Sequence, residues 1–276
     1  QISFDLSREL VIALWAEFLG TFIFQFFGGT EQVGPVNGVV LTVCIFMTAK
    51  YSGGNLNPAV SAGLCLTGIL PPFKAGLYAV AQISGSIAAA FLAAFIDLDE
   101  NLDAAGLDNW GEYKMPYLIP PGCHRTLPDR VRGSVFVLEM LGTFVLVATV
   151  HAVAVAKPGF GDHAPFAIGT WQVTKRRRTT RSLLTSLMTL RDSMPAAGLA
   201  IVVVVGGAGH ITGGFFNPAR FIGPALVFGC DLHNAWLYLI AQLLGGALAS
   251  LNHTRILEKL TPAPPLAKSE VVVEVL

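Results

Sequence analysis

The chain has 276 residues, of which 53% are hydrophobic and only 13% are charged, and its mean hydropathy is +0.60. A soluble domain usually carries about 25% charged residues, so this composition indicates a membrane protein. The formal net charge is zero, which gives no support to a nucleic-acid-binding protein or to partners of one charge sign.

Six apolar stretches, bounded by charged residues, Pro or Gly, predict membrane-spanning helices, since a crossing needs roughly 20 residues. The stretches are residues 10–27, 36–49, 73–96, 131–156, a part of 165–208, and 235–251. The polar residues 1–8 lead directly into the first stretch, which we therefore expect to be a full span and not a cleavable signal.

Two shorter apolar pieces, residues 57–66 and 217–228, each begin at an Asn-Pro pair and are too short to cross a membrane. Non-helical backbone at membrane depth is tolerated only where it is buried in protein or lines a water-filled cavity. We therefore expect both pieces to be re-entrant half helices, and such a pair in corresponding halves marks a pathway.

The chain contains an internal repeat. Three motifs occur twice in the same order: E-x-L-G-T-F from Glu17 and Glu139, S/T-G-G-x-x-N-P-A from Ser52 and Thr212, and A-Q-x-x-G from Ala81 and Ala241. Each half holds three predicted spans, and an odd number of crossings inverts the second copy relative to the first. The two half helices then enter from opposite faces and meet near the midplane.

The repeat divides the chain into four parts: a first repeat over residues 1–96, an extramembrane loop over 97–130, a second repeat over 131–254, and a tail over 255–276. Basic residues fall on one side of this topology, namely Arg8, Lys50, Lys74, Lys157, Arg255 and Lys259, with the basic end of the loop, residues 125–132, as the exception. The positive-inside rule makes that side cytoplasmic, so we expect both termini there.

A duplicated S/T-G-G-x-x-N-P-A within an inverted repeat of six spans resembles the aquaporin, or major intrinsic protein, channels. The resemblance covers about residues 8–254 without 170–198. It implies an all-α membrane protein with six transmembrane helices plus two re-entrant half helices. It further implies a homotetramer in the lipid bilayer of the plasma or vacuolar membrane. Each protomer would pass water and small neutral solutes such as glycerol, urea, ammonia or hydrogen peroxide, without a metal, a cofactor or enzyme activity.

The two Asn-Pro-Ala motifs comprise Asn57, Pro58 and Ala59, and Asn217, Pro218 and Ala219. Asn is a preferred N-cap and Pro a preferred first helical residue, so each motif begins a half helix with little strain. The positive ends of both helix dipoles then point at the pore centre. A water that accepts from both Asn amides must point its own hydrogens outward, which interrupts a proton relay.

The resemblance implies a narrow outer filter formed by Asn37, Val205, Gly214 and Arg220. An Arg in an apolar span is functional by default. The other three side chains leave a wide opening with little aromatic lining, a combination similar to some vacuolar-type plant members. Two alternatives stay open: Asn37 as a cap of the second span, and Val205 as a core residue.

Glu17 and Glu139 lie mid-span, and two interpretations are open. A lone intramembrane carboxylate can be a proton relay or an ion site, as in a coupled transporter. The resemblance implies instead that each braces the re-entrant loop of its own half by accepting hydrogen bonds from backbone N–H groups. We favour the bracing role.

The second half carries extra residues. The Asn-Pro pairs are 160 residues apart (217 minus 57), but the Glu pair is only 122 apart (139 minus 17). Residues 170–198 hold six of the 18 basic residues of the chain and interrupt the fifth span. Either this segment is foreign, as a retained intron would be, and the chain conducts poorly or not at all, or it is a genuine basic loop with a fifth span of residues 196–208. We favour the foreign segment.

The four cysteines, Cys44, Cys65, Cys123 and Cys230, show neither metal-site nor disulfide spacing. We expect them to be small apolar residues, with Cys123 in the loop that follows the third span.

Overall fold

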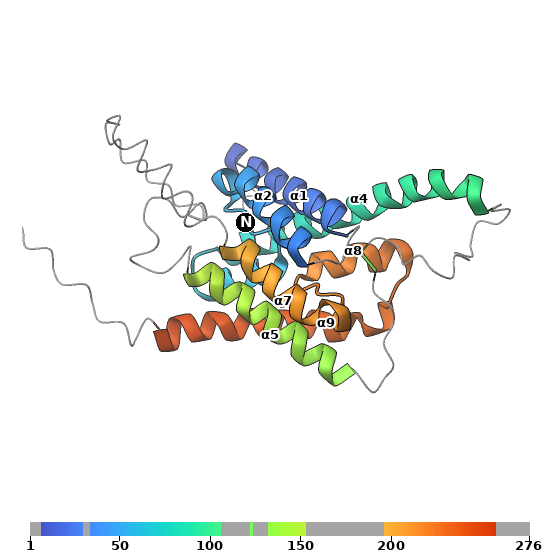
Figure 1. Ribbon diagram of the computed structural model, residues 1–276. Helices are drawn as coiled ribbons and strands as arrows, with labels where there is room; N and C mark the ends of the chain where they lie inside the picture. The colour runs from blue at the N-terminus through green and yellow to red at the C-terminus, as the bar shows by residue number, and fades with distance from the viewer. Residues whose placement is uncertain (1–6, 30–33, 106–121, 124–131, 153–195, 258–276) are drawn as a thin grey trace, which may run out of the picture.

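The computed structural model describes residues 7–29, 34–105, 122–123, 132–152 and 196–257, and every regular element in these ranges is a helix (Figure 1). The elements in chain order are α1 (Arg8–Gly29), α2 (Gly34–Ser52), α3 (Pro58–Leu66), α4 (Pro72–Ala105), α5 (Arg132–Val150), α7 (Ala196–Thr212), α8 (Pro218–Phe228), η4 (Leu232–Asn234), α9 (Ala235–Leu251) and η5 (Asn252–Leu257).

The helices lie where the apolar stretches predict them. Four are individually long and apolar enough to cross a membrane: Arg8–Gly29, Pro72–Ile96, Arg132–Val150 and Leu232–Leu257. The half helices α3 and α8 contain nine and 11 residues, too few for a crossing. Helix α4, which forms the third predicted span, runs on past its apolar part to Ala105. Figure 1 shows this end of α4 projecting from the bundle. Residues 97–105 include four acidic residues, which end the apolar stretch, but no Gly or Pro that would end the helix.

The packing of the two halves follows the predicted inverted repeat. In the first half α1 packs on α2 and α4, and in the second half α5 packs in the same way on α7 and α9. Each half helix packs on the last span of the other half, since α3 packs on α9 and α8 packs on α4. Helices α2 and α7 pack on each other across the two halves. Each contact thus has a counterpart in the other half, and the two repeats enclose one common centre.

The repeated glycines are sites of close approach between helices. A Cβ added at Gly85 would lie 2.3 Å from the carbonyl oxygen of Phe18, and one at Gly245 would lie 2.2 Å from that of Met140. A side chain at either position would push α4 from α1, or α9 from α5. The Gly of the A-Q-x-x-G motif is therefore repeated because both helix–helix contacts need a residue without a side chain.

The expectation for Cys123 and Cys230 is wrong, because these two residues form a disulfide. Cys230 follows the end of α8, and the turn at Gly122 lies against the end of α1, where the Gly122 amide donates to the Gly29 carbonyl at 2.8 Å. The two cysteines are 107 residues apart in sequence. They meet only because the fold brings residues 122–123 against α8, so no local spacing could reveal the pair.

The helix of the fifth predicted span, α7, begins inside the basic segment. Helix α7 has 17 residues, starts at Ala196 and runs on to Thr212, so residues 196–198 form its first turn. A helix of this length spans about 26 Å, slightly less than the roughly 30 Å hydrocarbon core. Residues 170–195 lie outside the part of the chain that the structure describes.

Candidate pore

Each half helix is capped by the Asn of its own motif. Asn57 has extended backbone angles, φ −157° and ψ 119°, and its Oδ1 accepts from the Ala59 amide at 2.8 Å. Asn217 repeats this geometry, with φ −155° and ψ 113°, and accepts from the Ala219 amide at 3.0 Å. In both cases the following Pro loses no hydrogen bond, since its missing N–H lies in the unpaired first turn.

The two motifs also hold each other. The Nδ2 of Asn57 donates to the Phe216 carbonyl at 2.9 Å, and the Nδ2 of Asn217 donates to the Leu56 carbonyl at 2.8 Å. A side-chain amide has two N–H donors, so each Asn keeps a second one for another acceptor. Both Asn therefore fix the opposite loop and still present a donor at the meeting point of the half helices.

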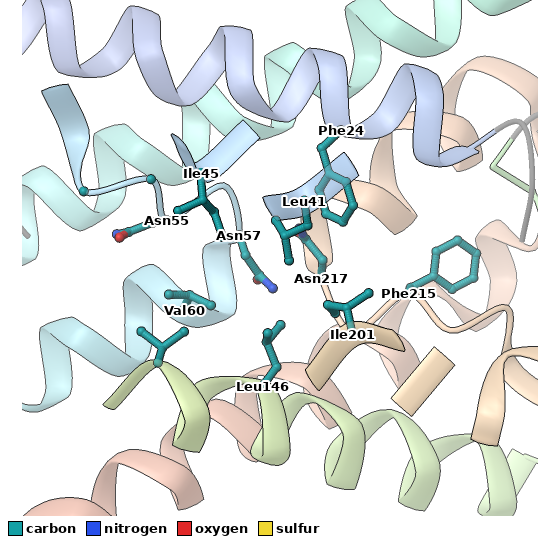
Figure 2. Close-up of a pocket in the computed structure, with 13 residues that line it drawn as sticks. Phe24, Leu41, Ile45, Asn55, Asn57, Val60, Leu146, Ile201, Phe215 and Asn217 are labelled. Carbon is teal, nitrogen blue, oxygen red and sulfur yellow. The ribbon is translucent and has the colours of Figure 1, made fainter. Parts of the chain in front are cut away.

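This meeting point borders a narrow cavity that is partly open to solvent. Figure 2 shows Asn57 and Asn217 at its middle, with Leu41 and Phe24 on one side and Leu146 on the other. The remaining lining is mostly apolar and comes from both halves: Ile45, Gly53, Gly54, Asn55, Val60, Val150, Ile201 and Phe215. The cavity thus has apolar walls and a pair of amides at its centre.

Glu17 holds the first re-entrant loop in place. Its Oε1 accepts from the Ser52 hydroxyl and from the Asn55 amide at 3.0 Å. Its Oε2 accepts from the Leu56 amide and from Gln82 Nε2, both at 2.7 Å. The carboxylate is fully buried and its two oxygens meet four donors, as a buried charge requires.

Glu139 does the same in the second half. Its Oε1 accepts from the Thr212 hydroxyl at 2.6 Å and from the Phe215 amide at 3.2 Å. Its Oε2 accepts from the Phe216 amide at 2.9 Å and from Gln242 Nε2 at 2.8 Å. The two carboxylates therefore have matching sets of donors, taken from matching positions of the repeat.

These bonds offset backbone strain in the loops. Leu56 and Phe216 have left-handed φ values of 51° and 47°, which costs about 1–3 kcal/mol for a residue with a side chain. A hydrogen bond to a charged acceptor contributes about 1.5–3 kcal/mol, and each carboxylate accepts two from its loop backbone. The strained loops persist because the hydrogen bonds of Glu17 and Glu139 hold them in this conformation. The same conformation turns the Leu56 and Phe216 carbonyls toward the opposite Asn.

The side chain of Arg220 is held on three sides. Its Nη1 donates to Asn37 Oδ1, and its Nη2 donates to the Gly28 carbonyl at 2.8 Å. Its Cζ lies 4.4 Å from the ring centroid of Phe24, within the range of a cation–π contact. A cation near a helix N-terminus is disfavoured by the helix dipole, so these partners from α1 and α2 compensate for that position.

In the structure the four predicted filter residues form two contacting pairs. Arg220 contacts Asn37, and a Cβ added at Gly214 would lie 3.1 Å from Val205 Cγ1. Asn37 lies inside α2, which begins at Gly34, so the interpretation of Asn37 as a helix cap is wrong. Val205 is also a member of the main apolar core, so its core interpretation holds beside its contact with Gly214.

A family model described as "Major intrinsic protein" matches residues 6–177 and 166–271. The chain belongs to the major intrinsic protein family. It is a multi-pass membrane protein and an aquaporin-family channel, not an enzyme, and the predicted family and fold are confirmed. The two matches overlap over residues 166–177, at the start of the basic segment.

Plant aquaporins are among the relatives. The "Probable aquaporin TIP2-2" of Arabidopsis thaliana is 30% identical over 274 residues, which cover 91% of this chain and 90% of that protein. The "Aquaporin NIP3-1" of the same plant is 30% identical over 88% of this chain and 68% of its own length. Among solved structures, the aquaglyceroporin from Plasmodium falciparum has the same fold, with a TM-score of 0.65, 20% identity, and coverage of 91% and 98%.

Several residues of this aquaporin-family site have no role in the sequence predictions. The hydroxyls of Tyr78 and Tyr238 donate to the carbonyls of Ser52 and Thr212 at 2.9 Å and 3.0 Å, and so fasten the start of each re-entrant loop. Both tyrosines lie four residues before the Gln of a repeated A-Q pair, a match that the repeat could have revealed. Phe24 had no such signal, because it follows the first repeated motif and has no aromatic counterpart at the matching Leu146.

Proposed function

We propose that this channel conducts water and small neutral solutes passively and excludes protons and ions. The observation that carries the proposal is the reciprocal pair of hydrogen bonds between the Asn-Pro-Ala loops at the centre of an apolar cavity. The glycerol, urea, ammonia or hydrogen peroxide range is part of the proposal, as is a homotetramer with a pore in each protomer.

Proton exclusion follows from the arrangement of donors. A water between Asn57 and Asn217 accepts from both amides, so its own hydrogens point away along the pore and the chain of water-to-water donation reverses there. The N-termini of α3 and α8 carry partial positive charge and repel cations. Arg220 adds a full positive charge at one end of the same route, so each charged element opposes cations.

Stopped-flow light scattering on proteoliposomes tests this function. We expect water flux well above that of empty vesicles, flux of at least one neutral solute such as glycerol or urea, and no proton current with a pH-sensitive dye inside the vesicles. Rejection of every neutral solute would restrict the function to water. A proton current would overturn the exclusion argument.

A coupled transporter that uses Glu17 and Glu139 is the less supported alternative. Both oxygens of each carboxylate already accept hydrogen bonds from the loop and from a Gln, which suits a brace and opposes repeated protonation. Gradient-driven current in liposomes would favour the transporter.

We also propose that both termini face the cytoplasm, in the plasma or vacuolar membrane. Disulfides persist in oxidising compartments, so the Cys123–Cys230 pair supports a non-cytosolic location for the Arg220 end of the bundle. Helix α1 starts at Arg8 at the opposite end, which agrees with the positive-inside rule. Labelling of an added terminal tag in sealed cells, before and after permeabilisation, tests this orientation.

A further inference from the structure

The four family filter positions supply little bulk in this chain. Val205 and Gly214 are small, and the amide of Asn37 accepts from Arg220. None of the four side chains is aromatic. A filter that sorts neutral solutes by size needs a rigid wall beside its hydrogen-bond donors, and these residues do not provide one.

The aromatic ring of Phe24, from α1, lies beside the Arg220 guanidinium. The Phe24 side chain is only 2% exposed, lines the central cavity, and lies with its ring against the Arg220 guanidinium. In Figure 2 the ring lies beside Leu41. Phe24 therefore borders both the arginine and the cavity, between the guanidinium donors and the Asn pair.

The ring is held by its surroundings. Gly28, one helical turn further along α1, lies next to it, and a Cβ added there would be 3.4 Å from Phe24 Cδ2 and 2.8 Å from Asn37 Oδ1. The carbonyl of Gly28 accepts from Arg220. Helix α1 thus offers the guanidinium a ring face and a carbonyl one turn apart, so the ring and the arginine fix each other.

We infer that Phe24 is a fifth filter residue that determines specificity: its ring forms the wall of the passage next to Arg220 and sets the largest neutral solute that passes. The inference rests on the proposed function, since it concerns the size limit of that same passage. A solute that hydrogen-bonds Arg220 with one edge must slide its carbon backbone past the ring. Enlarging or shrinking the ring then changes solute flux more than water flux.

The rival interpretation is that Phe24 only packs, because it also belongs to the main apolar core. A packing role predicts that substitution lowers stability and scales all fluxes together. A filter role predicts a change in the ratio of solute flux to water flux, in opposite directions for smaller and larger side chains.

The test compares Phe24→Leu, Phe24→Trp and a matched control, Phe27→Leu, in proteoliposomes. Phe27 lies on the same helix, three residues further along, and is 55% exposed. Water flux is measured first, followed by a polyol series of three, four and five carbons together with urea, each normalised to channel content. Thermal unfolding in detergent checks that each variant folds.

We expect Phe24→Leu to raise the flux of the four- and five-carbon polyols relative to water several-fold. Phe24→Trp should lower glycerol relative to water, and Phe27→Leu should leave every ratio unchanged. Equal scaling of all fluxes in both Phe24 variants would overturn the inference while the proposed function stands. No wild-type flux above empty vesicles would overturn both. If Phe24→Leu does not fold, the Phe24→Trp ratio alone decides.

Discussion

The side-chain amide of Asn217 donates to the backbone carbonyl of Leu56 at 2.8 Å, across a sequence separation of 161 residues. The reciprocal bond, from Asn57 to the carbonyl of Phe216, closes the pair. Each Asn therefore caps its own half helix with its oxygen and holds the opposite loop with its nitrogen. An Asn side chain can do both because it carries an acceptor and two donors on one planar group.

The first prediction separates these two tasks. Asn217→Ser keeps a good N-cap oxygen but removes the donor to Leu56, so we expect a loss of about 1 kcal/mol of stability for the missing hydrogen bond. Asn217→Ala removes both tasks and should cost about 1 kcal/mol more. Thermal unfolding of the purified channel measures the difference, and equal destabilisation by Ser and Ala would contradict the two-task assignment.

The second prediction concerns the buried carboxylates. Glu139→Gln replaces an acceptor oxygen by an N–H₂ group, so a backbone donor of the loop at Phe215 or Phe216, or the Gln242 amide, loses its partner. Each unpaired buried donor costs about 1–3 kcal/mol, so we expect poor folding and low yield. A proton-coupled transporter would instead give a well-folded Glu139→Gln variant that has lost its coupling. Glu9→Gln, at an exposed position in the first turn of α1, is the control and should change nothing.

Much of this architecture can be predicted from the sequence because the repeat duplicates it. The matched motifs at Glu17 and Glu139 indicated a shared role, and the structure gives both carboxylates the same set of donors. The apolar stretches also located the helices, and the sixth predicted span has the same bounds as α9. Hydropathy and duplication are local signals, so they predict elements and paired positions well.

The contacts that the repeat does not predict are those between unlike segments. The bond from Arg220 to Asn37 joins residues 183 apart, which only the family resemblance placed in one filter, and the Cys123–Cys230 disulfide joins residues 107 apart. Neither pair has a counterpart in the other repeat, so duplication carries no information about it. Phe24 is of the same kind, since its role depends on where α8 places Arg220.

The third prediction tests the disulfide by counting thiols. The fold leaves two free cysteines, Cys44 and Cys65, among the four of the chain. After denaturation without reductant, we expect a maleimide mass tag to modify two cysteines, and after reduction all four. The Cys230→Ser variant should give three tagged cysteines without reductant. It should also be less stable, by about 2–4 kcal/mol in the usual range for such a cross-link. Four tagged cysteines in the unreduced wild type would rule out the bond.

The last prediction concerns the basic segment, residues 170–198. Placing its Arg and Lys side chains within a span would cost at least about 2.5 kcal/mol each, so the segment cannot be part of a working helix in the bilayer. Yet α7 begins at Ala196, so its last three residues are helical in this chain. Two deletions separate these facts: removal of 170–198, which joins Gly169 to Leu199, and removal of 170–195, which keeps the observed helix start.

If the segment is foreign, the 170–198 deletion restores a continuous apolar span from residue 165 to 208, and we expect more tetramer and higher water permeability than for the full chain. The 170–195 deletion adds three small residues to that span and rotates the part before the junction by about 300° relative to Val205, at about 100° per residue. It should therefore work less well. Equal or better yield and flux of the full chain would mean that the segment is a genuine loop of this channel. Sequencing the transcript across codons 169–199 gives an independent answer, since an intron sequence would be missing from the correctly spliced message.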